Sequence, residues 1–140
     1  MTHRLSPDDE QFKKDFEACA VLPAEFNHRT HIRLAYMYLC ENEPELAYQN
    51  MRASLQTFLD YHGVDASKYH ETVTRAWLMA VQHLMMQAAP AKSADAFVTA
   101  NSRLLDKKIM LTHYSKARLF SDEARVTFVQ PDLEAIPQYN

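Results

Sequence analysis

Apolar residues follow a helical spacing over most of the chain. In the first such segment, Phe12, Phe16 and Cys19 follow one another at steps of four and three residues. This spacing places them on one face of an α-helix, because side chains three or four residues apart lie above one another. The same spacing recurs downstream, and it predicts helices over residues of about 7–20, 28–39, 44–62, 68–89 and 94–108.

Residues typical of helix starts and ends agree with these segments. Side chains that can accept hydrogen bonds from free backbone N–H groups stand near the start of each predicted helix. They are Ser6, Asn27, Asn42, Ser67 and Ser93. Gly63 stands where a left-handed residue would end the third helix. Beyond residue 108 the pattern weakens, so we expect one short helix capped by Ser121 and a surface tail over residues 130–140.

Composition favours an all-α fold. A single glycine among 140 residues is far below the usual share of roughly 7%. Long glycine-free stretches rich in Ala, Leu, Met, Glu and Gln favour helix over strand. The length fits one domain over residues 1–140, and a hydrophobic share of 47% supplies one core. We therefore expect a single-domain helical bundle of about five helices with an irregular C-terminal segment.

Charge and hydropathy argue against two classes of partner. The net charge is −3, and Lys and Arg are dispersed, whereas a nucleic-acid-binding protein presents a basic stripe to the phosphates. No apolar run reaches the ~18–20 residues that span a bilayer. The first ten residues are acidic rather than apolar, unlike a signal peptide, and two cysteines imply no disulfide framework. The expected location is the cytoplasm, without a nucleic-acid or membrane partner.

Histidines on the apolar faces of two predicted helices suggest a polar site inside the bundle. His28 and His31 are three residues apart, so both imidazoles point to one side of a helix, as two ligands of one metal ion must. His70 stands near the start of another apolar helix and would supply a third ligand. Three protein ligands leave a position open for water or substrate. We therefore predict one divalent transition metal ion (Zn, Fe, Mn, Ni or Cu) at His28, His31 and His70, in an enzyme that acts on a small polar molecule.

Two further residues are candidates for acid–base chemistry. Glu71 follows His70 and is a candidate ligand or general base, although its spacing to Arg75 also fits a surface ion pair. Tyr114, next to His113, lies in an irregular segment that can fold back over the site. Two alternatives therefore stay open. One is a metal-free enzyme that uses His70 with Glu71 or Tyr114, and the other is a non-enzymatic ligand- or protein-binding module whose histidines are structural or pH-sensing.

These residues also carry a resemblance to a family of small, all-helical bacterial proteins. The shared pattern comprises Phe26-Asn27-His28-Arg29-Thr30-His31, an F-x-H-x-x-H motif, and Lys68-Tyr69-His70-Glu71-Thr72. It continues through Leu104-Leu105-Asp106-Lys107-Lys108 and then from His113-Tyr114-Ser115 to Ser121. The resemblance covers most of the chain and implies no particular activity. In physical terms, Tyr114, Ser115 and Arg118 are expected to pack across the pocket as a cover.

Overall fold

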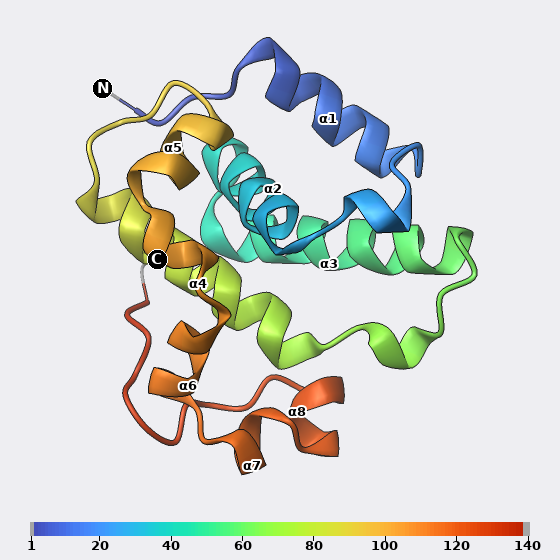
Figure 1. The fold of residues 1–140 in the computed structure, drawn as a ribbon, viewed down its shortest axis with the longest axis vertical. Helices are drawn as coiled ribbons and strands as arrows, with labels where there is room; N and C mark the ends of the chain where they lie inside the picture. Colours follow the sequence, from blue (N-terminus) through green and yellow to red (C-terminus); the bar gives the residue numbers. More distant parts are fainter. Residues whose placement is uncertain (1, 139–140) are drawn as a thin grey trace.

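The computed structural model describes residues 2–138 and confirms the all-α fold (Figure 1). Within that range no strand occurs, and the longer helices are α1 (Pro7–Glu17), α2 (His28–Glu41), α3 (Pro44–Tyr61), α4 (Glu71–Gln87) and α5 (Ala94–Ala100). Shorter elements are η1 (Pro23–Glu25), η2 (Ala66–Lys68), η3 (Ser102–Leu105), η4 (Lys107–Ile109), α6 (Met110–His113), α7 (Lys116–Leu119) and α8 (Asp122–Val126). No helix in this part of the chain is long and apolar enough to cross a bilayer.

Helix α2 lies at the centre of the bundle, where it packs against α1, α3, α4 and α5. Because it is covered from several sides, its buried residues are not limited to one apolar stripe. Leu34, Tyr36 and Met37 are as completely buried as Ile32 and Ala35. Helices α6, α7 and α8 gather beyond one end of this bundle (Figure 1), where α8 packs against α4.

Stacked aromatic rings join α1, α3 and the segment before α2. The ring of Phe16 lies 5.1 Å from that of Phe26 and 4.7 Å from that of Phe58, centroid to centroid. Phe26 and Phe58 are themselves 5.6 Å apart. Offset aromatic pairs of this kind stabilise a core by more than their buried area alone. The cluster holds the start of α2, with its two histidines, against α1 and α3.

Most of the predicted helix starts are confirmed, and two are wrong by a few residues. Side chains of the predicted residues cap α1, α2, α5 and α8: Ser6, Asn27, Ser93 and Ser121. Gly63 follows α3 with a left-handed φ of 68°, as predicted. The cap of α3 is Glu43 rather than Asn42. Ser67 belongs to η2, and α4 is capped by His70 instead.

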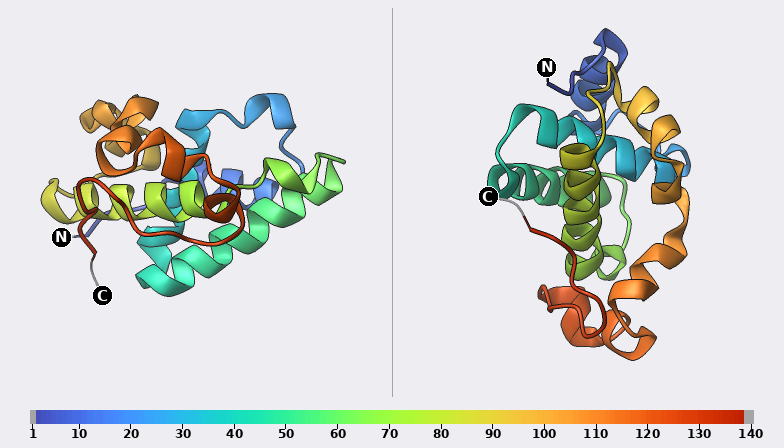
Figure 2. Two further views of the ribbon diagram at one scale, coloured as in Figure 1. Left: turned by 90° about the horizontal axis from the view of Figure 1, so that it is seen from below. Right: turned by 90° about the vertical axis from the view of Figure 1, so that its left-hand side faces the viewer.

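Residues 127–138 are anchored to the bundle rather than lying loosely on it. The buried hydroxyl of Thr72 donates to the carbonyl of Thr127 (3.0 Å) and accepts from the N–H of Val129 (3.1 Å). Ile136, within the predicted tail, is only 4% exposed. Figure 2 shows this segment running back beside α4. Residues 130–138 of the predicted surface tail over 130–140 are exposed except for the half-buried Pro131 and the buried Ile136, and the last two residues lie outside the described range.

Candidate functional site

His28 and His31 lie together at the start of α2, as their spacing requires. Their rings stand edge to face with centroids 6.4 Å apart. The Nε2 atom of His28 donates to the carbonyl of Leu104 (2.9 Å), and its ring packs on Trp77 at 4.7 Å. Burial lowers the pKa of His28, although the Leu104 carbonyl opposes the shift. Since a carbonyl oxygen can only accept, Nε2 carries a proton, and Nδ1 alone keeps a lone pair for a ligand.

His31 is the more deeply buried of the two imidazoles. Its Nε2 atom is inaccessible to solvent and has no hydrogen-bond partner among residues 2–138. The ring faces Phe26 at 6.0 Å. Burial, together with the neighbouring His28, lowers the pKa of His31 to about 4. The ring is therefore neutral near pH 7, with one polar atom unsatisfied in an aromatic environment.

His70 does not join this pair. Its Nδ1 atom accepts from the N–H of Val73 (3.1 Å) and so caps α4, and its Nε2 atom donates to the carbonyl of Leu119 (2.9 Å). Both ring nitrogens are therefore engaged, and neither lone pair is free for a metal ion while these bonds hold. Trp77, which contacts His28, lies two turns further along α4, roughly 10 Å along the helix axis.

No group of three or more His, Cys, Asp or Glu side chains in the described range is arranged to hold a metal ion. The histidine spacing thus brings together two of the three predicted ligands. The metal ion at His28, His31 and His70 stays a prediction.

Glu71 is buried, and its partner is not the one that its spacing indicates. Its Oε1 atom lies 2.9 Å from Nε of Arg52 on α3, whereas Arg75 pairs with Glu45 at 3.2 Å. Only 6% of the surface of Glu71 is exposed. This burial raises the pKa of Glu71, and the charge of Arg75 partly offsets the effect. The carboxylate therefore links the start of α4 to α3.

Tyr114 and the residues after it bind residues 127–138, which we call the C-terminal segment. The buried hydroxyl of Tyr114 donates to the carbonyl of Val129 (2.7 Å), and burial raises the pKa of Tyr114 to about 12. The hydroxyl of Ser115 donates to Asp132 (2.6 Å), and Nε of Arg118 donates to the carbonyl of Gln130 (2.6 Å). The three residues that were expected to cover the histidines therefore form hydrogen bonds with residues 129–132.

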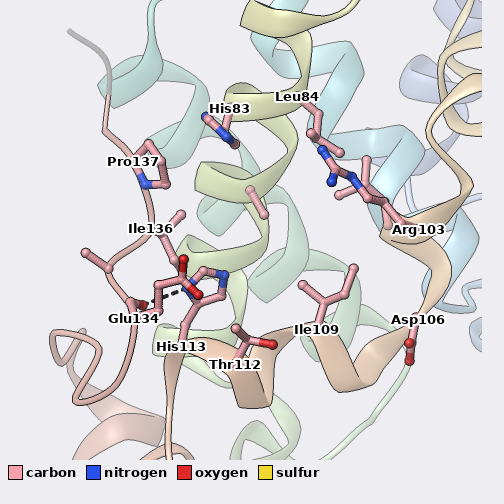
Figure 3. Close-up of a pocket in the computed structure, with 13 residues that line it drawn as sticks. His83, Leu84, Arg103, Asp106, Ile109, Thr112, His113, Glu134, Ile136 and Pro137 are labelled. Atoms are coloured by element: carbon pink, nitrogen blue, oxygen red, sulfur yellow. Dashed lines mark hydrogen bonds between the residues drawn. The ribbon is translucent and has the colours of Figure 1, made fainter.

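A groove lies between α4, the η3–α6 region and the C-terminal segment (Figure 3). Its volume is about 510 Å³. Its apolar lining consists of Ala80, Leu84, Leu104, Ile109, Ala135, Ile136 and Pro137, and its polar lining of His83, Arg103, Asp106, Thr112, His113 and Glu134. We call this cavity the α4 groove.

Polar groups stand on two opposite walls of the α4 groove. On one wall, Nδ1 of His113 donates to the backbone carbonyl of Glu134 (2.7 Å), so Nε2 is the nitrogen left to accept from a ligand. On the other wall, the guanidinium of Arg103 extends toward Leu84 on α4 (Figure 3). It makes no ion pair or hydrogen bond with any residue from 2 to 138. Asp106 points away from the groove and caps η4 through Lys108 N–H (3.0 Å).

Sequence reasoning did not find this groove. It assigns no role to Arg103, and it expects the segment with His113 to fold over the α2 histidines rather than to line this groove. No single short motif contains all of these residues, because the groove forms only where α4, the η3–α6 region and the C-terminal segment meet. The signals in the chain are weak: a partly apolar C-terminal segment and an arginine beside the buried Leu104.

Comparison of the chain with family models, with curated proteins and with solved structures finds no match.

Proposed function

We propose that this protein binds a small, largely apolar molecule in the α4 groove. The observation that carries the proposal is a cavity of about 510 Å³ with a partly apolar lining and polar groups on two walls. Small-molecule sites typically have volumes of about 300–1,000 Å³, with a mostly apolar lining and a few polar groups that orient the ligand. The groove meets that description. The site predicted at His28, His31 and His70 does not meet it, because both ring nitrogens of His70 are already hydrogen-bonded within the protein.

Three parts of the chain hold the groove open. Helix α4 contributes Ala80 and Leu84, the η3–α6 region contributes Ile109, and the C-terminal segment contributes Ile136. The segment is fixed in place because Leu133 N–H donates to the carbonyl of His113 (3.0 Å). A cavity with walls set by such contacts is largely formed before a ligand enters, which lowers the entropic cost of binding.

A blocking substitution tests the proposal. Ala135 is exposed and lines the groove, so Ala135→Trp places an indole in the cavity without disturbing the core. Gln138→Trp is the matched control, because Gln138 is an exposed residue of the same segment outside the groove. The neutral fluorescent probe N-phenyl-1-naphthylamine serves as the ligand. We expect it to bind to the wild type and to Gln138→Trp and to lose at least about tenfold in affinity in Ala135→Trp.

Two results would overturn the proposal. One is the absence of saturable probe binding to the wild type. The other is equal binding to the wild type and to Ala135→Trp, with both proteins shown to be folded by circular dichroism. Either result would mean that the groove is not a ligand site.

A further inference from the structure

We infer that the ligand of the α4 groove is an aromatic or alkyl carboxylate whose acid group pairs with Arg103. This inference rests on the proposed function, since it names the chemical class of the molecule bound there. It starts from Arg103, which has no ionic partner among residues 2–138 and presents a guanidinium at the mouth of an apolar cavity. A guanidinium matches the geometry of a carboxylate, because two parallel N–H groups can donate to its two oxygens.

The charges around the groove decide at which wall the acid group lies. Glu134 places its negative charge beside His113 on the far wall (Figure 3), which disfavours a carboxylate there. The other acidic residue of the lining, Asp106, points away and accepts a backbone N–H of η4. Among the described lining residues, Arg103 therefore offers a positive charge that neither Glu134 nor Asp106 neutralises.

The rest of the ligand must be apolar. Between the two walls lie side chains that offer no hydrogen bond, including Leu84, Leu104 and Ile136, of which Leu104 and Ile136 are almost completely buried. A polar ligand body would lose its water here without gaining partners, which costs free energy. A ring or alkyl chain instead gains from each apolar contact. One acid group on an apolar body is the chemistry that fits both parts of the site.

Matched probes test the inference. 2-Naphthoate and 2-naphthamide have the same ring and nearly the same shape but differ in charge. Isothermal titration calorimetry on the 140-residue chain should show naphthoate binding about tenfold more tightly than naphthamide, as a charge-assisted hydrogen bond implies. Arg103→Gln should remove this difference while leaving the affinity for naphthamide unchanged. Arg103→Lys should keep part of the difference, because a lysine keeps the charge but loses the two-pronged geometry.

Lys108→Gln is the charge control, because Lys108 is an exposed residue of the neighbouring η4 outside the groove lining. It should leave the preference for naphthoate within about twofold of the wild type. If the preference falls as far in Lys108→Gln as in Arg103→Gln, general surface charge explains it and the assignment to Arg103 is wrong.

The outcomes separate this inference from the proposed function. Equal affinities of the wild type for naphthoate and naphthamide, both abolished by Ala135→Trp, would leave the groove as a ligand site but overturn the carboxylate class. A tenfold preference that survives in Arg103→Gln would also overturn it. Failure of all the aromatic probes to bind to the wild type would overturn the proposed function itself.

Discussion

The buried imidazole of His31 should make the stability of the protein depend on pH. Burial lowers the pKa of His31 from 6.5 to about 4 in the folded chain, whereas the unfolded chain keeps the ordinary value. Between pH 6.5 and pH 4 the unfolded state therefore binds a proton that the folded state does not. The stability contributed by neutral His31 is fully present above pH 6.5 and falls as the pH drops toward 4.

The size of the effect follows from the same pKa difference. Lowering the pKa from 6.5 to about 4 corresponds to about 3 kcal/mol of unfolding free energy. Burial also lowers the pKa values of His28 and His70, so these two groups add to the pH dependence of stability. The effect of His31 is therefore isolated by comparing the wild type with variants that cannot titrate at this position.

The contribution of His31 to this pH dependence is measured by urea denaturation at pH 7.5, 6.5, 5.5 and 4.5. The proteins compared are the wild type, His31→Phe and His31→Gln. The two variants differ in polarity and should differ in stability at pH 7.5. Both should nevertheless lose less free energy than the wild type as the pH falls, by about 2 kcal/mol at pH 4.5. If the difference between the wild type and each variant stays constant over this range, His31 is not a buried neutral imidazole and the reasoning fails.

Two further predictions concern the C-terminal segment and the metal. Thr72→Val removes a buried hydroxyl that bonds both Thr127 and Val129, so it should lower the free energy of unfolding by about 1–3 kcal/mol and speed hydrogen exchange of the Val129 amide. Thr57→Val, at an exposed site on α3, should change neither. The metal predicted at His28, His31 and His70 is tested by elemental analysis of untagged protein: a stoichiometric metal lost in His31→Ala supports it, and only background metal in both proteins rules it out.

The sequence by itself determined the first four long helices and the proximity of two histidines. The helix predicted over residues 94–108 was wrong at its end, because α5 stops at Ala100 and the 3₁₀ turns η3 and η4 follow it. Helical periodicity and capping are local properties, since a stripe or a cap depends on residues three or four positions apart. Ser6, Asn27 and Ser93 therefore cap the helices for which they were predicted. For the same reason His28 and His31 had to lie on one side of α2, whatever the rest of the chain does.

Only the tertiary structure decided what these helices present to one another. Glu71 has Arg75 one turn away on its own helix, yet it pairs with Arg52 because α3 packs against the start of α4. His70 meets the carbonyl of Leu119, a residue 49 positions further on, so its nitrogens serve the fold. The α4 groove likewise forms where Arg103, His113 and Ile136 meet from separate segments. Such pairings depend on which apolar faces bury one another, and local spacing carries no information about them.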